Sequence, residues 1–227
     1  MATRDPSTPL LVFDVNETLS DLGPLAEAFT AVGAPGYLVD HWFSSVLRDG
    51  FALSITGSCP NFANVGRGVL AGLLSGHSLH VAPDAAIEQI MSAFAKLPVH
   101  SDVAEGIGAL HAAGLRVCTL SNGGTAFAEA MLTRAGVRNL VDPLLSVQDA
   151  GAWKPVPQAY RYAAEATGVA VADLMLVAVH PWDCDGAIRA GLQAAWIDRT
   201  GAPYPPFFAT PDRTAESIVD LAAQLSR

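Results

Sequence analysis

The stretch LLVFDVNETL, residues 10–19, decides the fold of this chain. Its first four residues form an apolar run of strand length, and Asp14 follows directly after them. Similar apolar runs recur along the sequence, with stretches of helical apolar spacing between them. This alternation predicts an α/β fold with a parallel sheet. The expected strands are residues 10–13, 115–120, 144–147, 174–179 and 194–197.

Three of the helices expected between these runs have a clear end. Each is followed by a glycine, which is favoured there because it adopts a left-handed backbone conformation at little steric cost. The expected helices are residues 102–113, 125–135 and 157–167, which stop at Gly114, Gly136 and Gly168.

The gap between the first and second expected strands is far longer than a crossover connection needs. Four segments within it have helical spacing of apolar residues, and none has the pattern of a strand. We therefore predict a helical cap domain at residues 20–98, inserted into a core domain made of residues 1–19 and 99–227. The expected cap helices are residues 24–32, 37–48, 61–74 and 83–97.

The composition excludes several kinds of partner. Acidic residues outnumber basic ones by 22 to 13, giving a net charge of −9. A nucleic-acid partner is not expected, because phosphate binding needs a basic surface.

The apolar run at residues 10–13 is too short for a signal sequence or a membrane span, so we expect a cytoplasmic protein without membrane contact. Cys59, Cys118 and Cys184 lack metal-ligand spacing and are expected to be reduced thiols.

Side chains that can do chemistry follow four of the expected strands. In a parallel sheet such residues gather beyond the carboxyl ends of the strands. A carboxylate held there beside an ammonium stays ionised and can attack an electrophilic carbon. A lone aspartate would more simply be a turn residue, so the coincidence of all four strand ends carries the argument. The candidates are Asp14, Ser121, Asn122, Lys154, His180 and Asp183.

The order of these residues resembles a known family. The segments DVNETL at 14–19, SNG at 121–123, WKP at 153–155 and WD at 182–183 are similar to the motifs of the haloacid dehalogenase (HAD) superfamily. The resemblance covers nearly the whole chain and is closest to the type II L-2-haloacid dehalogenases. It implies a Rossmann-like core with an inserted helical cap, a hydrolase acting on a small-molecule carboxylate, and a homodimer.

Position 16 distinguishes the main chemistries of that superfamily. The phosphatases that resemble this chain carry a second aspartate there to protonate the leaving alcohol. Asn16 cannot exchange a proton, whereas a halide needs none in order to leave. The resemblance therefore implies hydrolysis of short 2-haloalkanoic acids to 2-hydroxy acids, with no metal and no cofactor. A weak Mg²⁺ site at Asp14, Asp183 and Asp185 is the alternative.

The resemblance also implies a role for each candidate. Asp14 would attack the halogen-bearing carbon and form an ester, which water then hydrolyses. Lys154 would keep Asp14 ionised and help to hold it, and Asp183 would support Lys154 and the hydrolytic water. Thr18 would orient Asp14, or would only cap the following segment. The expected substrate-binding residues are Ser121, Asn122, Trp42, Phe43 and Tyr160.

Three positions depart from the family pattern. Phe43 follows Trp42 where the type II enzymes have a halide-binding arginine, and Arg48 is the candidate substitute. His180 stands where the family has the asparagine of a Ser-x-Asn motif, either as a general base for water or as a simple hydrogen-bond partner. Glu17 replaces a glycine, which predicts an altered loop and a contact with the cap.

These departures leave the identity of the leaving group undecided. The same nucleophile could open the strained ring of azetidine-2-carboxylate, with His180 supplying a proton to the amine. A phosphatase and a non-catalytic protein of the same fold are further alternatives. The cap aromatics are expected to form a small dry pocket for a two- or three-carbon acid, although such residues also form cap cores and dimer interfaces. Tyr160 likewise has an alternative as a helix packing residue.

Overall fold

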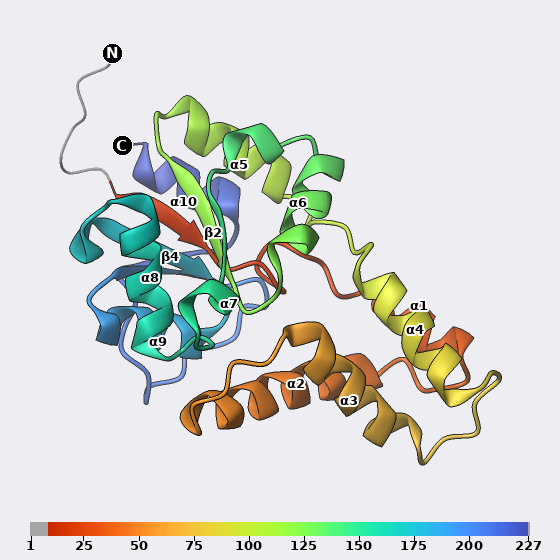
Figure 1. Ribbon diagram of the computed structural model, residues 1–227. Coiled ribbons are helices and arrows are strands. Elements are labelled where there is room, and N and C mark those ends of the chain that lie inside the picture. Colours follow the sequence, from red (N-terminus) through yellow and green to blue (C-terminus); the bar gives the residue numbers. More distant parts are fainter. Residues whose placement is uncertain (1–8, 227) are drawn as a thin grey trace.

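The computed structural model describes residues 9–226. Six strands form one sheet in the order β3-β2-β1-β4-β5-β6, and every neighbouring pair is parallel (Figure 1). The predicted α/β fold with a parallel sheet is confirmed. The strands are β1 (Leu10–Phe13), β2 (Val117–Ser121), β3 (Leu144–Ser146), β4 (Leu174–Ala178), β5 (Gln193–Ile197) and β6 (Arg213–Ala215).

The central strand β1 is buried on both faces because its side chains alternate between two apolar layers. Leu10 and Val12 belong to the layer that contains α8 and α9, and Leu11 and Phe13 to the layer that contains α5, α6 and α10. The sheet is therefore covered by helices on both sides. The core helices are α5 (Val103–Ala112), α6 (Thr125–Arg134), α7 (Val147–Ala150), α8 (Pro157–Thr167), α9 (Pro181–Ala190) and α10 (Ile218–Leu225), with short 3-10 turns at Arg138–Leu140 and Val171–Asp173.

Four helices occupy the chain between β1 and α5 and extend to one side of the sheet (Figure 1). An isolated antiparallel bridge between Ser20 and Val99 ties together the two segments that lead to them and back. These helices pack on one another, so we call them the helical unit. Its members are α1 (Leu25–Ala31), α2 (Leu38–Ile55), α3 (Phe62–Leu74) and α4 (Pro83–Phe94).

The expected helix stops are confirmed. Gly114, Gly136 and Gly168 have φ values of 80°, 75° and 63°, in the left-handed region that glycine favours. The helix expected at residues 157–167 has these bounds in the structure, with Pro157 in its first turn.

Helix α2 is longer than expected, because it continues past residue 48 to Ile55. Gly50 lies inside it, although glycine weakens helices. The reason is a close approach: a Cβ atom on Gly50 would lie 2.2 Å from Cζ3 of the buried Trp153. The glycine therefore lets α2 pack directly against the loop that carries Lys154.

Replacing Gly50 by alanine is expected to lower the free energy of unfolding by about 1–3 kcal/mol, because the added methyl group overlaps the Trp153 ring. Urea unfolding would measure the change. Gly72→Ala in α3 is the matched control, since nothing lies within 4 Å of its Cβ position. That change is expected to be neutral or to stabilise by up to about 1 kcal/mol. Equal effects of the two substitutions would contradict the packing argument.

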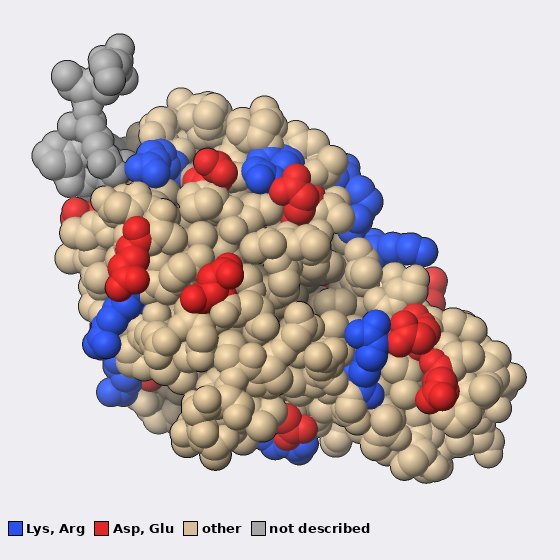
Figure 2. Space-filling view, viewed as in Figure 1, with Lys and Arg blue, Asp and Glu red and all other residues tan. Residues whose placement is uncertain are grey.

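Charged side chains of both signs are scattered over the face shown in Figure 2. Within residues 9–226, no helix combines the length and the apolar character that crossing a membrane requires. All three cysteines are free thiols; Cys118 and Cys184 are buried and Cys59 is partly exposed.

Candidate active site

Asp14 lies directly after β1, at the carboxyl edge of the sheet. Its backbone N–H donates to the carbonyl of Val177 in β4 at 3.0 Å, which fixes the residue to the sheet. Its side chain is almost fully buried, and both oxygens are bound. Lys154 Nζ donates to Oδ1 at 2.8 Å, and Thr18 Oγ1 donates to Oδ2 at 2.7 Å. The carboxylate is therefore held in one orientation.

Lys154 lies between two carboxylates. Its fully buried ammonium donates to Asp14 and, at 2.6 Å, to Oδ2 of Asp183. Asp183 stands in the first turn of α9, where the helix dipole favours negative charge. Its other oxygen accepts the hydroxyl of Tyr160 at 2.5 Å. The Tyr160 side chain is fully buried, as in the packing alternative for this residue, and its expected contact with a substrate stays a prediction.

These contacts separate the pKa values of the two carboxyl groups. Burial alone would raise the pKa of Asp14, but the nearby Lys154 ammonium and His180 lower it well below its ordinary value. Burial and the charge of Asp14 raise the pKa of Asp183 against the opposing effect of Lys154. The two acidic partners overcome burial and raise the pKa of Lys154. Asp14 is consequently ionised at neutral pH.

The Lys154 loop is fixed by Asn122, which follows β2. The Asn122 side-chain amide makes two hydrogen bonds to the backbone of Lys154. Asn122 Oδ1 accepts the Lys154 N–H at 2.9 Å, and Asn122 Nδ2 donates to the Lys154 carbonyl at 3.3 Å. The preceding Ser121 accepts the N–H of Gly123 at 2.9 Å. Both side chains thus hold the loops around Asp14, and their expected contact with a substrate stays a prediction.

The loop that carries Thr18 is clamped from the end of β5. Thr18 Oγ1 accepts the N–H of Val179 at 3.1 Å while it donates to Asp14. Its carbonyl accepts from Nη2 of Arg199 at 2.9 Å, and Nη1 of Arg199 donates to Asp102 at 2.8 Å. The geometry predicted for Thr18 as a hydrogen-bond partner of Asp14 is therefore present.

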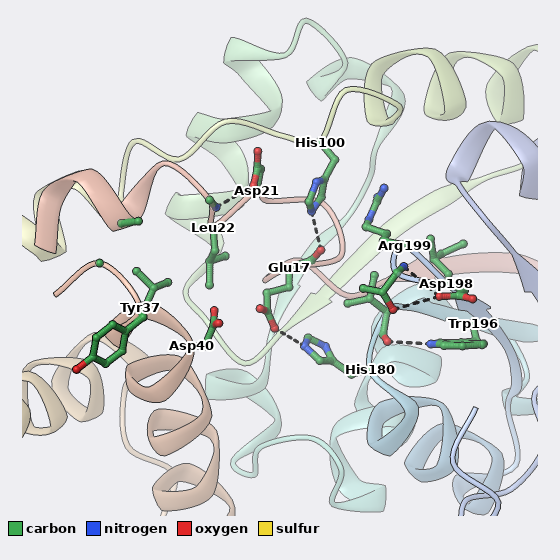
Figure 3. Close-up of a pocket in the computed structure, with 17 residues that line it drawn as sticks. Glu17, Asp21, Leu22, Tyr37, Asp40, His100, His180, Trp196, Asp198 and Arg199 are labelled. Atoms are coloured by element: carbon green, nitrogen blue, oxygen red, sulfur yellow. Dashed lines mark hydrogen bonds and ion pairs between the residues drawn. The ribbon is translucent and has the colours of Figure 1, made fainter. Parts of the chain in front are cut away.

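Glu17 and His180 form a pair (Figure 3), and His180 also lies close to Asp14. His180 Nε2 lies 2.8 Å from Glu17 Oε2, and His180 Nδ1 lies 3.3 Å from Asp14 Oδ2, out of line for a hydrogen bond. Glu17 has a φ of 62°, a conformation that suits the glycine expected at this position. Its backbone is held there by Ser20 Oγ, which accepts its N–H at 3.1 Å, and by His100, whose Nε2 lies 2.9 Å from its carbonyl.

The charge state of His180 follows from this pairing. Burial would lower the pKa of the imidazole, but Asp14 and Glu17 together raise it to about 9. The ring is therefore an imidazolium at neutral pH in the free protein. It cannot act as a general base in that state, although it can donate a proton.

Aromatic side chains of the helical unit cover this pair. Phe43 is buried and stacks on the His180 ring, with centroids 6.2 Å apart. Trp42 is fully buried in the core of the helical unit, where its indole N–H donates to the carbonyl of Gly66 at 3.0 Å. Its expected contact with a substrate stays a prediction. Arg48 is also not a substitute halide ligand, because its side chain is 70% exposed and pairs with Asp49.

Two cavities flank the loop after β1. The first, of about 600 Å³, reaches Glu17 and His180 and is lined by Asp21, Asp40, Asp198 and Arg199 among others (Figure 3). The second, of about 360 Å³, is lined by Asn16 and Gly123 on the core side and by α3 and α4 on the other. Volumes of this size are typical of ligand pockets. The expected small pocket over Asp14 for a two- or three-carbon acid stays a prediction, because Asp14 lines neither cavity.

The donor set does not fit the alternative of a divalent metal. Lys154 Nζ occupies the position between Asp14 and Asp183 that a cation would need. Asp185 is engaged elsewhere, with Arg189 at 2.7 Å and the N–H of Ala209 at 2.8 Å. In the described part of the chain, no three His, Cys, Asp or Glu side chains are grouped as metal ligands.

Sequence reasoning missed Arg199 and the partnership of Glu17 with His180. Arg199 was findable, because Asp198 and Arg199 follow the expected strand at 194–197 in the same way that Asp14 follows its strand. The sequence indicated the pairing of Glu17 with His180 more weakly, only through a glutamate at a position where the family has glycine. Its partner lies 163 residues away in the chain, and only the fold brings the two together.

Comparison with known proteins adds an independent observation. A sequence profile described as a haloacid dehalogenase-like hydrolase matches residues 8–191. Haloacetate dehalogenase H-2 of Moraxella sp. (strain B) is 35% identical over 133 residues, which cover 57% of this chain and only 59% of that protein. The (S)-2-haloacid dehalogenase of Pseudomonas fluorescens is 25% identical over 93% of both chains. A crystal structure of a dehalogenase with an intermediate complex superposes with a TM-score of 0.89 at 26% identity, covering 97% of this chain and 98% of that one.

Proposed function

This chain belongs to the haloacid dehalogenase-like hydrolases, and from that premise we propose that it hydrolyses 2-haloalkanoic acids to 2-hydroxy acids through an ester on Asp14. The observation that carries the proposal is the buried Asp14 carboxylate, held ionised by Lys154 and oriented by Thr18. The names of the haloacetate and (S)-2-haloacid dehalogenases among its relatives support the substrate class.

In the first step, a carboxylate oxygen of Asp14 attacks the halogen-bearing carbon from the side opposite the halogen. The carbon–oxygen bond of an ester forms, and the carbon–halogen bond breaks with both electrons leaving on the halide. Lys154 favours this step because its charge keeps Asp14 deprotonated. Thr18 limits the rotation of the attacking group.

In the second step, water attacks the carbonyl carbon of the Asp14 ester, releasing the 2-hydroxy acid and restoring the carboxylate. Esterification removes the negative charge of Asp14, which is one of the two causes that raise the pKa of His180. The imidazole can then lose its proton through the cavity that it lines and accept one from the attacking water. Glu17 holds the ring in place at 2.8 Å. Asp183 supports Lys154 throughout.

Two features argue against a phosphatase. Asn16 offers no acid to protonate a leaving alcohol. The Lys154 ammonium already binds one oxygen each of Asp14 and Asp183, which leaves fewer carboxylate oxygens free for a divalent cation. The site therefore suits a leaving group that does not need a proton from residue 16 in order to depart.

Ring opening of azetidine-2-carboxylate is a second candidate because of one observation. The His180 imidazolium lies 3.3 Å from Asp14 and can donate a proton to a leaving amine. Asp14 would attack the ring carbon next to the carboxylate, the carbon–nitrogen bond would break, and the amine would take the His180 proton. Phe43, which stands in place of a halide-binding arginine, is compatible with this leaving group.

A substrate panel tests the proposal. The protein is incubated with 2-chloropropionate, fluoroacetate, azetidine-2-carboxylate and p-nitrophenyl phosphate, with and without Mg²⁺. We expect halide and a 2-hydroxy acid from a haloacid. A single turnover in ¹⁸O-labelled water should give unlabelled product, because the new oxygen comes from Asp14. Release of phosphate that depends on Mg²⁺, with no organic acid converted, would contradict both candidates.

The role of His180 gives a separate prediction. His180→Gln is expected to form the ester but to hydrolyse it slowly, because the base for water is missing while Asp14 and Lys154 remain. Halide should appear in a burst that matches the enzyme concentration, and intact-mass spectrometry should detect the acylated protein. Turnover should fall about 10²–10⁴-fold. Loss of the burst itself would mean that His180 acts in the first step instead.

Two further parts of the proposal concern assembly. We propose that residues 20–98 act as a cap that closes over Asp14, since Trp153 of the core donates its indole N–H to the carbonyl of Pro60 at 2.9 Å. We also propose a homodimer, for which the exposed apolar side chains Tyr37 and Ile55 at the two ends of α2 offer a surface. Light scattering in solution would measure the mass, and a monomer would contradict the second part.

A further inference from the structure

The His180 ring is fixed in its plane by aromatic neighbours. Phe43 of α2 and Trp182 of α9 stack on it, with ring centroids 6.2 Å and 5.0 Å from its own. Stacking fixes the plane of an imidazole but not which edge faces which neighbour. A half-turn about the Cβ–Cγ bond keeps the plane and exchanges each ring nitrogen with a carbon. A hydrogen-bond partner must therefore decide which nitrogen of His180 faces Asp14.

Glu17 is that partner. Its Oε2 lies 2.8 Å from Nε2 of His180 (Figure 3). The other nitrogen, Nδ1, then lies 3.3 Å from Oδ2 of Asp14, is buried, and has no hydrogen-bond partner among the described residues. In a neutral imidazole the hydrogen bond made by one nitrogen decides where the proton stays, so a carboxylate at Nε2 leaves the free lone pair on Nδ1. The nitrogen that can accept a proton is therefore the one beside the carboxyl group of Asp14.

The backbone of Glu17 is in a conformation that glycine would adopt more easily. Its φ of 62° lies in the left-handed region, where other residues are uncommon. Ser20 Oγ and His100 Nε2 hold it there, at 3.1 Å from its N–H and 2.9 Å from its carbonyl. Residues held in such conformations cluster at functional sites, where the side chain has a task that offsets the strain. The contact with His180 provides that task.

Among the described residues, Asp14 and Glu17 are the two charged groups whose contacts raise the pKa of His180. Lys154 binds the other oxygen of Asp14, and Asp183 is bound to Lys154 and Tyr160. The remaining charged or titratable groups that line the cavity of about 600 Å³ make no hydrogen bond or ion pair with the ring; they are Asp21, Asp40, His100, Asp198 and Arg199. When Asp14 becomes an ester and loses its charge, Glu17 is the carboxylate that remains in contact with the imidazole.

We propose that Glu17 is a positioning residue for hydrolysis of the Asp14 ester: acting through His180, it directs Nδ1 of the imidazole toward the ester as the base for water. The role rests on the proposed function for the ester, with either a halide or an amine as the leaving group. Nδ1 takes a proton from water while the water oxygen bonds to the ester carbonyl carbon. The bond from that carbon to the substrate oxygen then breaks, and this oxygen takes the proton from Nδ1. The new carboxyl group of Asp14 finally gives its proton to Nδ1, which restores the resting pair.

Glu17→Gln tests this role, because it removes the charge and keeps the size of the side chain. The value of kcat/KM should stay within about threefold of wild type, since the ester forms before Glu17 acts. The value of kcat should fall at least about tenfold, with a halide burst equal to the enzyme concentration. The acid limb of the pH profile of kcat should move to lower pH, because the imidazolium loses its anionic partner. Damage to the loop itself would instead lower kcat/KM, because it would displace Asp14.

Two further variants separate the contact from folding and from the general charge of the cavity. Glu17→Gly suits the positive φ, so its melting temperature should stay within about 4 °C of wild type while kcat falls as in Glu17→Gln. Asp40→Asn removes an exposed carboxylate from the same cavity and should leave kcat and its acid limb unchanged. Equal kcat values and equal acid limbs in Glu17→Gln and wild type, or equal falls of kcat and kcat/KM, would overturn the role of Glu17 and keep the dehalogenase. No conversion of any organic acid by the wild type would overturn the proposed function and this role with it.

Discussion

Replacing Asp14 by asparagine is expected to abolish turnover, with a fall in kcat/KM of at least about 10⁴-fold, a loss typical of removing a nucleophile. An amide carries no negative charge and cannot form the ester. The fold should survive, because Lys154 keeps Asp183 as a partner at 2.6 Å. Thr18 also keeps its second hydrogen bond, from the N–H of Val179.

Halide release and intact-mass spectrometry measure the effect of Asp14→Asn. No halide burst and no acylated protein should appear, in contrast to His180→Gln. Asp149→Asn is the matched control, because Asp149 is an exposed aspartate in α7 and makes the same chemical change outside the site. Activity above about a hundredth of wild type would mean that water attacks the substrate directly and that Asp14 is not the nucleophile.

The sequence predicted the fold well where local rules decide the structure. The apolar run before Asp14 forms a strand because no polar group interrupts it, and residues 157–167 form a helix because Pro157 starts it and Gly168 ends it. Strand β6 escaped prediction because its three residues, Arg213–Ala215, are mostly exposed and have no apolar pattern. The predicted end of α2 at residue 48 was wrong, because the helix continues through Gly50, whose packing on Trp153 is a tertiary contact.

The sequence predicted which residues form the site better than it predicted how their side chains are oriented. Strand ends brought Asp14, Lys154 and Asp183 together, since topology alone places them at one edge of the sheet. Spacing could not show that Tyr160 turns toward Asp183, or that Trp42 turns into the helical unit. Those directions depend on which neighbour offers a hydrogen-bond acceptor, and that neighbour lies far away in the sequence.

Replacing Lys154 by methionine is expected to damage both activity and stability, because its ammonium serves two buried carboxylates. Without it, one of Asp14 and Asp183 must take up a proton at neutral pH, and the nucleophile loses its charge. We expect kcat/KM to fall at least about 10³-fold. The free energy of unfolding at neutral pH should fall by about 3–5 kcal/mol, the usual effect of removing one partner from a buried ion pair.

The pH dependence of the free energy of unfolding identifies why Lys154→Met is less stable. In the wild type the pKa of Asp14 is lowered on folding, so its stabilising contribution is present above the unfolded pKa of about 3.9 and is lost as the pH falls. In Lys154→Met the carboxyl groups have raised pKa values, so the variant instead gains stability as the pH falls. Urea unfolding at pH 7.5 and 4.5 should therefore show a smaller difference between the two proteins at the lower pH. Lys96→Met removes the only other lysine, which is exposed, and should behave as wild type at both values. A loss of stability that is equal at both pH values would place the effect in packing rather than in the charge that holds Asp14 ready to attack.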